Sequence, residues 1–312
     1  MTFPTPIDVA DDGTLRSPLR APAQMLADQE YDGHSSVHDD DQAEKLGLAG
    51  APIEGPTHFS QFDPLAVHRW GRGWFEHGCL SAHFRNMVVE GDEVRAELTP
   101  TGPTASTIAA FTADDTPVLT GTATLGADDP TDLDERRKRG EGDPGDLYIV
   151  DRLEIGMTRD PVIVTMEIDS HNGPLYPFTL SEKLAAITEH SSWYDGDSPW
   201  GGPIVPTEML SVLAHQKGAE FPVRGPAIGL FIDLEVRYVD GPVFVGRTYE
   251  VTHRLVGIGQ SRAVESYWTE STVTDTTTGS HAATVLLHQG VFKASYADYP
   301  APSAPSAPSS TS

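Results

Sequence analysis

The sequence predicts an α+β protein built from two copies of one unit, in which a helix packs against an antiparallel sheet. The main observation is a repeated turn, GAPIEGPT at residues 50–57 and GPIVPT at residues 202–207. An apolar run with helical spacing follows each turn. Segments with the period-2 alternation of a half-buried strand come next, at residues 93–98 and 232–238. The two halves therefore predict the same order of elements.

The expected helices begin at recognisable signals. The first opens at residues 56–57, is restarted or kinked at Asp63-Pro64, and carries apolar side chains at helical spacing over residues 59–70. In the second half, residues 179–182 have the spacing of a capping box, and a further helix follows residues 206–207. Each half is thus expected to hold a buried helix against its strands.

The composition of three stretches divides the chain. Its start is polar and weakly patterned, a run of charged residues separates the repeats, and the end is poor in large apolar groups. We predict an N-terminal extension (residues 1–15), a first repeat (16–127), a charged linker (128–145), a second repeat (146–296) and a disordered Pro/Ala/Ser tail (297–312).

Charge and composition narrow the classes of function. A net charge of −25 over 312 residues would repel nucleic acids and anionic membrane surfaces. Cys79 is the single cysteine, which excludes an internal disulfide, and we expect it to be a small buried residue. The N-terminus lacks the pattern of a signal peptide, and no apolar run approaches the ~18 residues of a membrane span. We therefore expect a cytoplasmic protein that binds neither nucleic acid nor membrane.

One segment carries a resemblance to a known family. Residues 37–55 (VHDDDQAEKLGLAGAPIEG) contain a histidine, acidic residues, an alanine and then a turn of the Gly-Pro-Ile-x-Gly kind. This pattern resembles the signature of the MaoC-like, or R-specific enoyl-CoA hydratase, family. The resemblance implies the hotdog fold, in which a sheet wraps a central helix, and long members carry two hotdogs in one chain. A double hotdog of the α+β class is therefore the expected fold.

The resemblance also implies a chemistry, the reversible addition of water across a 2-enoyl thioester. His38 matches the catalytic histidine of the family, and Gly55 matches the glycine whose N–H binds the thioester oxygen. An imidazole suits proton transfer near neutral pH, and a backbone N–H at a helix start suits a developing oxyanion.

The family's aspartate is not in its usual place. It is expected five residues before the histidine, where this chain has Gly33, with Asp32 one residue out of register and Asp39 following the histidine. Asp32 is the candidate that a bulge would restore to the dyad. Asp39 and His58, beside the helix start, are candidates for substrate binding.

The second half departs further from the pattern. Tyr194 stands five residues after Glu189, as if the dyad spacing survived with other residues, and Pro206 takes the place of the turn glycine without an N–H to donate. Glu189, His190 and Tyr194 form a polar cluster that could join the site from this half, or could only cap a helix and form a turn. The first half is expected to be the active one.

These observations predict a hydro-lyase that acts on an acyl thioester or a related activated carbonyl compound. A hotdog thioesterase and a non-catalytic acyl-binding protein stay open as alternatives. The expected partner is a small-molecule substrate, an acyl group linked to CoA or to a carrier protein, and a homodimer is also left open. No cofactor is expected, and no metal, because His34 and His38 lie in a loop without a third ligand in spacing.

Overall fold

The computed structural model describes residues 2–30, 33–127, 129–140 and 142–300. Asp32 and most of the predicted tail, residues 301–312, lie outside the described residues. The strands are β1 (Asp8–Val9), β2 (Leu15–Arg16), β3 (Gly78–Phe84), β4 (Val94–Pro100), β5 (Ala105–Thr112), β6 (Pro117–Leu125), β7 (Val162–Thr165), β8 (Gly229–Tyr238), β9 (Thr248–Gln260), β10 (Val264–Asp275) and β11 (His281–Phe292). The helices are α1 (Asp40–Lys45), the 3-10 helix η1 (Gly55–Phe62), α2 (Asp63–Trp70), α3 (Gly73–His77), α4 (Asp132–Gly140), α5 (Leu180–Ala186), α6 (Ser192–Asp195), α7 (Met209–His215) and the 3-10 helix η2 (Lys293–Ser295).

The order of the strands shows the duplication directly. They form one sheet in the order β1-β2-β4-β5-β6-β3-β8-β11-β10-β9-β7. Without the short edge strand β1, the first half runs β2-β4-β5-β6-β3 from its outer side inward and the second runs β7-β9-β10-β11-β8, which is the same permutation of consecutive strands. The halves meet where β3 pairs antiparallel with β8, from Cys79 opposite Arg237 to His83 opposite Asp233. The predicted α+β class with two equivalent repeats is confirmed.

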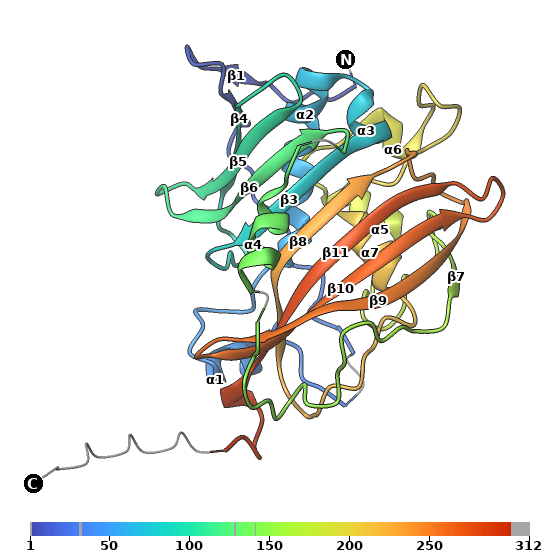
Figure 1. Ribbon diagram of the computed structural model, residues 1–312. Coiled ribbons are helices and arrows are strands. Elements are labelled where there is room, and N and C mark those ends of the chain that lie inside the picture. The colour runs from blue at the N-terminus through green and yellow to red at the C-terminus, as the bar shows by residue number, and fades with distance from the viewer. Residues whose placement is uncertain (1, 31–32, 128, 141, 301–312) are drawn as a thin grey trace, which may run out of the picture.

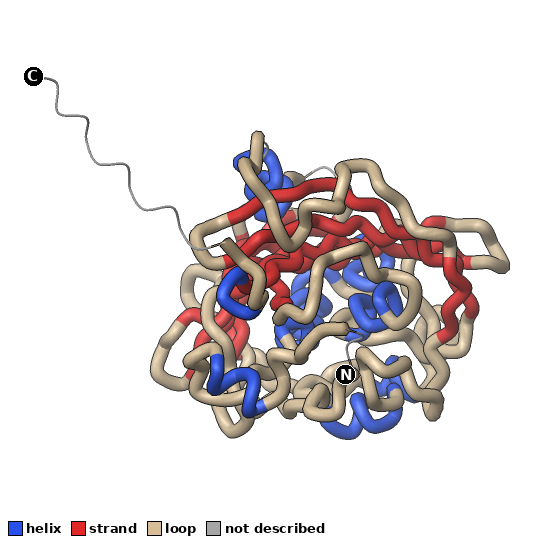
Figure 2. The backbone as a smooth tube through the Cα atoms, turned by 90° about the horizontal axis from the view of Figure 1, so that it is seen from below, coloured by secondary structure: helices blue, strands red, loops and turns tan. Residues whose placement is uncertain are grey.

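The sheet curves around the helices. Figure 2 shows the strands arching over helices on the concave side, and Figure 1 shows the two sets of strands side by side with α2, α5 and α7 behind them. The first-half helix is not a single long α-helix, because its first eight residues are 3-10 and the α-helix begins at Asp63-Pro64. The second-half helix α7 spans only seven residues. The capping box predicted at Thr179 and Glu182 is present at the start of α5.

The repeated turn is anchored in the same way in both halves. The Ile53 N–H donates to the Val88 carbonyl at 2.7 Å, and the Val205 N–H donates to the Val243 carbonyl at 2.8 Å. Because this pattern aligns Ile53 with Val205, Thr207 rather than Pro206 takes the place of Gly55. The sequence alignment of the two turns was therefore wrong by one residue.

Thr207 belongs to a buried polar cluster between the halves. Its hydroxyl donates to the carboxylate of Asp63 at 2.6 Å, and that carboxylate also accepts from Trp74 Nε1 and the Tyr194 hydroxyl, both at 2.8 Å. Burial raises the pKa of Asp63 to about 6, although these hydrogen bonds act in the opposite direction. In the second half, the position of the turn glycine is thus occupied by a side chain that joins the two repeats.

Segments outside the expected repeats also pack against the fold. In the N-terminal extension, Phe3 is buried, and β1 and β2 continue the sheet beyond β4. The charged linker contains α4, whose Leu133 packs with Trp268 and Leu286 on the outer side of the sheet. Near the C-terminus, the Tyr299 ring packs edge-on against Tyr148.

Candidate active site

A cavity of about 530 Å³ lies where the first-half turn faces the second half. Its walls come from the loop that carries His38, the start of η1, the β3 residue Phe84, the β8 residue Phe231 and the end of α7. The loop around His38 is held against the second half, because Ser35 forms a parallel bridge with Ile228. The cavity is therefore built from both repeats.

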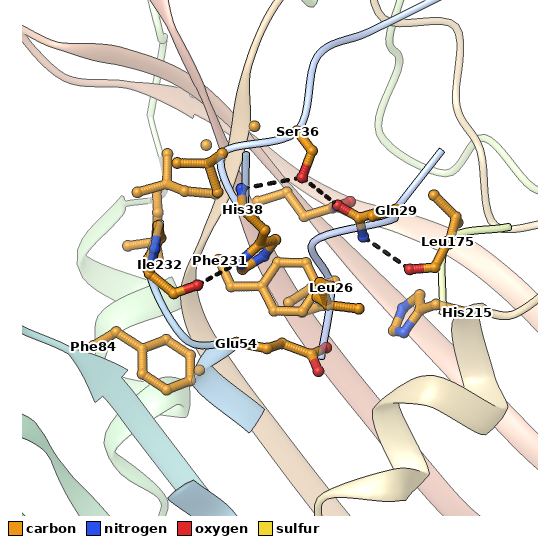
Figure 3. A pocket seen from close by; sticks show the side chains of 18 of the residues that line it. Leu26, Gln29, Ser36, His38, Glu54, Phe84, Leu175, His215, Phe231 and Ile232 are labelled. Atoms are coloured by element: carbon orange, nitrogen blue, oxygen red, sulfur yellow. Dashed lines mark hydrogen bonds between the residues drawn. The ribbon is translucent and has the colours of Figure 1, made fainter. Parts of the chain in front are cut away.

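His38 is fixed in this cavity by its own loop. Its Nδ1 lies 2.6 Å from the carbonyl oxygen of Pro52, and its backbone N–H donates to the Ser36 hydroxyl at 3.1 Å. The Ser36 hydroxyl donates in turn to Gln29 Oε1, and Gln29 Nε2 donates to the Leu175 carbonyl of the second half. Figure 3 shows this chain of hydrogen bonds along one wall of the cavity.

These contacts determine the protonation of His38. A carbonyl oxygen can only accept, so Nδ1 carries the proton and Nε2 of the neutral ring holds a lone pair. Burial lowers the pKa of His38, and the Pro52 carbonyl offsets this in part. The ring is therefore neutral at pH 7 and suited to accept a proton at Nε2.

Gly55 provides a backbone N–H at the first position of η1. Among the described residues, no carbonyl or side chain accepts from this N–H. The start of a helix leaves such donors available for an oxygen that gains negative charge. A side chain has no room here, since a Cβ on Gly55 would lie 2.7 Å from Cζ of Phe84.

We expect Gly55→Ala to destabilise the protein by about 1–3 kcal/mol, as overpacking of a filled site typically does. The added methyl group must displace the Phe84 ring, so Phe84→Leu in the same chain should recover much of the loss. Urea unfolding of the single and double variants measures this. Gly102→Ala is the matched control, because a Cβ there meets nothing within 4 Å. Additive losses in the double variant would contradict the proposed clash.

Glu54 is a cavity residue that the sequence analysis missed. It stands between Ile53 and Gly55 in the turn, and the residue is only 6% exposed. Its Oε1 atom has no hydrogen-bond partner among the described residues. Burial raises the pKa of Glu54 to about 7; Lys183 lowers it and Glu208 raises it. A carboxyl group with this pKa can give or take a proton near neutral pH.

A buried lysine of the second half, Lys183, interacts electrostatically with Glu54. Lys183 Nζ donates to the Thr57 hydroxyl at 3.0 Å and lies 3.2 Å from Glu208 Oε1. His58, which also lines the cavity, is nearly fully buried, and burial together with Lys183 lowers its pKa to about 4. His58 is therefore neutral at pH 7. The positive charge of Lys183 is thus shared between Glu54 and Glu208. It offsets only part of the free-energy cost of ionising the buried carboxyl group of Glu54.

The pKa of Glu54 predicts a pH-dependent stability. The folded protein keeps this proton up to about pH 7, whereas the unfolded chain loses it near 4.5, so the stabilisation is fully present below pH 4.5 and is lost as the pH rises to 7. Glu54→Gln cannot ionise. We therefore expect its free energy of unfolding, relative to that of the wild type, to rise by up to about 3 kcal/mol from pH 4.5 to pH 8.

Urea unfolding at several pH values between 4.5 and 8 measures this difference. Glu44→Gln on the exposed face of α1 is the control, and its difference from the wild type should stay constant with pH. A constant difference for Glu54→Gln as well would show that Glu54 ionises with an ordinary pKa.

The structure brings only some of the sequence candidates together. His38, Gly55 and His58 line the cavity, whereas Asp39 is exposed and caps α1 through the Gln42 N–H. Three second-half candidates lie away from the cavity lining. Glu189 is buried against Arg20, His190 pairs with Asp195 at the surface, and Tyr194 binds Asp63 in the core.

Two further features concern the described residues. No group of three or more His, Cys, Asp or Glu side chains there is arranged to hold a metal ion. None of the helices in the described part of the chain is both long and apolar enough to cross a membrane.

No protein-family model matches the sequence, and no curated protein matches it. Solved structures do resemble it. A conserved hypothetical protein of Mycobacterium tuberculosis, described as having a double hotdog fold, is 12% identical over 81% of this chain and 86% of its own, with a TM-score of 0.49.

The repeated strand order and the helices on the concave side of the sheet decide the fold without these likenesses. The chain is a double hotdog. Two further solved structures are similar to the chain at low identity. The dehydratase domain of PpsC from Mycobacterium tuberculosis, solved in complex with C12:1-CoA, is 13% identical over 92% of this chain and 97% of its own, with a TM-score of 0.48. A MaoC-like dehydratase is 11% identical over 88% and 97%, with a TM-score of 0.44.

Proposed function

We propose that this double hotdog is a MaoC-like hydro-lyase that interconverts a 3-hydroxyacyl thioester and the corresponding 2-enoyl thioester. One observation carries the proposal. A single cavity is lined by a neutral histidine, a carboxyl group with a pKa of about 7, and a glycine at the start of a helix. These are the base, the acid and the oxyanion donor that the elimination of water requires.

In the dehydration direction, His38 Nε2 removes the proton from C2 of the substrate. Charge then develops on the thioester oxygen, which accepts a hydrogen bond from the Gly55 N–H. The C3–O bond breaks, and the carboxyl group of Glu54 gives its proton to the leaving hydroxyl, which departs as water. The proton held by His38 returns to Glu54 through solvent, and hydration is the same sequence in reverse.

Glu54 takes the role of the aspartate that the family signature expects. It precedes Gly55 directly, so the acid and the oxyanion donor are placed by the same turn. Its pKa of about 7 leaves a substantial fraction of both protonation states at neutral pH. The proposal therefore needs no contribution from Asp32.

The test is incubation of the full chain with short and medium 2-enoyl and 3-hydroxyacyl thioesters of CoA and of N-acetylcysteamine. A change in enoyl absorbance without thiol release supports the hydro-lyase. Thiol release would instead identify a thioesterase, in which the Glu54 carboxylate activates water against the thioester carbon. Binding of the thioesters without either reaction would identify a non-catalytic acyl-binding protein. His190→Ala serves as a control, because His190 is exposed and outside the cavity lining.

A further inference from the structure

The cavity continues beyond the reacting groups into the second half. Its walls there are largely apolar and include Phe221, Leu287 and Val291. The last residue of α7, His215, also lines this region, and Figure 3 shows its ring directed into the cavity from the side opposite Phe84. The steps proposed for the reaction do not use His215.

The hydrogen bonds of His215 leave one nitrogen open. Its Nδ1 lies 2.7 Å from the carbonyl oxygen of Ser211 in the preceding turn of α7, so Nδ1 carries the proton. Its Nε2 therefore holds a lone pair, and this atom is buried without a hydrogen-bond partner among the described residues. The residue is only 6% exposed. A buried acceptor without a partner is costly, which makes such an atom a marker for a ligand.

His215 offers an acceptor and not a charge. Burial is the main cause that lowers its pKa to about 4, and the stacked His253 contributes to the same shift. The ring is neutral throughout the pH range of ordinary assays. A neutral Nε2 accepts from a hydroxyl or amide N–H, but it cannot bind a carbonyl or an ether oxygen.

We propose that His215 Nε2 binds a hydroxyl group on the acyl chain of the substrate, remote from the carbons that react. The inference rests on the proposed function for the identity of the ligand as an acyl thioester. The apolar lining residues Phe221, Leu287 and Val291 favour the acyl chain over the polar carrier arm in this part of the cavity. The preferred substrates are thus hydroxylated acyl groups and not plain fatty acyl groups.

The experiment measures binding, so that it does not depend on turnover. The probes are analogues of dodecanoyl-N-acetylcysteamine in which an NH group replaces the sulfur atom, so that an amide replaces the thioester. The dodecanoyl chain is either plain or carries one hydroxyl group beyond C5. Calorimetry with the wild type should find one hydroxylated isomer that binds about tenfold more tightly than the plain chain, the difference expected when one buried hydrogen bond is made or lost. His215→Leu should remove this preference.

Two variants keep the result interpretable. His215→Gln retains an acceptor oxygen of similar reach and should keep part of the preference. His190→Leu is the control, because His190 is exposed and lies outside the cavity lining. Equal binding of all probes by the wild type, or an equal loss for plain and hydroxylated probes in His215→Leu, would overturn this inference alone. Failure of every probe to bind would overturn the proposed function as well.

Discussion

Replacing His38 with alanine is expected to lower kcat for dehydration by about 10²- to 10⁴-fold, the usual contribution of a general base. The imidazole has one nitrogen committed to the Pro52 carbonyl, so its second nitrogen is the only one available to the substrate. Because the proposed role of His38 is proton transfer, binding of the substrate should be affected far less than turnover. A stopped assay of enoyl absorbance with saturating substrate measures kcat directly.

The fold of the His38→Ala variant is checked by thermal unfolding, since His38 is partly buried and its loop contacts the second half. His190→Ala, in which another histidine is lost from the surface, should keep the wild-type rate. If a correctly folded His38→Ala protein retains full activity, the base lies elsewhere. His34, His58 and His215 are the other histidines of the cavity lining and would be examined next.

Replacing Glu54 with glutamine should produce the second large loss, again about 10²- to 10⁴-fold in kcat, because glutamine cannot donate a proton to the leaving hydroxyl. Glutamine has nearly the same shape, so the turn at Gly55 should persist. The comparison variant is Asp32→Asn, which removes the carboxylate that stands nearest to the family position in sequence. We expect that variant to change kcat by less than about threefold, far below the contribution of a general acid.

The pH dependence distinguishes an acid from a structural carboxylate. Glu54 is needed in its protonated form for dehydration, so kcat/KM should fall as the pH rises through about 7. The overall reaction releases no proton, so kcat/KM for hydration should fall in parallel. Glu54→Gln should lack this limb in both directions. A wild-type profile that is flat between pH 6 and 8, or a limb that survives in Glu54→Gln, would assign the acid to another residue.

The fold was predictable because its signals are local and occur twice. The turn at residues 50–57, its copy at 202–207 and the capping box at Thr179 each depend on neighbours within a few residues. The alignment of the copies was wrong by one residue because it matched Pro52 with Pro203. The backbone hydrogen bonds instead align Ile53 with Val205. Sequence similarity over so short a motif cannot fix a register that backbone hydrogen bonds to Val88 and Val243 determine.

The sequence predicted residues of the site only where the family signature contains them. His38 and Gly55 lie in the cavity, but the role proposed for Glu54 depends on Lys183, which is 129 positions away and reaches the turn only in the folded chain. The cluster at Glu189 and Tyr194 shows the converse. Its spacing suggested a second dyad, whereas Arg20 and Asp63 of the first half engage these side chains. An acidic residue next to the turn glycine was the one signal that could have pointed to Glu54.

The pairing of β3 with β8 has a consequence for how the cavity responds to dilution. Two separate hotdog subunits that shared such a site would lose it when they dissociate, and their stability would depend on protein concentration. Here both walls belong to one polypeptide, and the seam from Cys79 to His83 closes intramolecularly. Dissociation of the two repeats therefore cannot make the specific activity depend on the amount of protein in the assay. Covalent linkage also allows each wall to change on its own, as with a glycine at position 55 and a threonine at position 207.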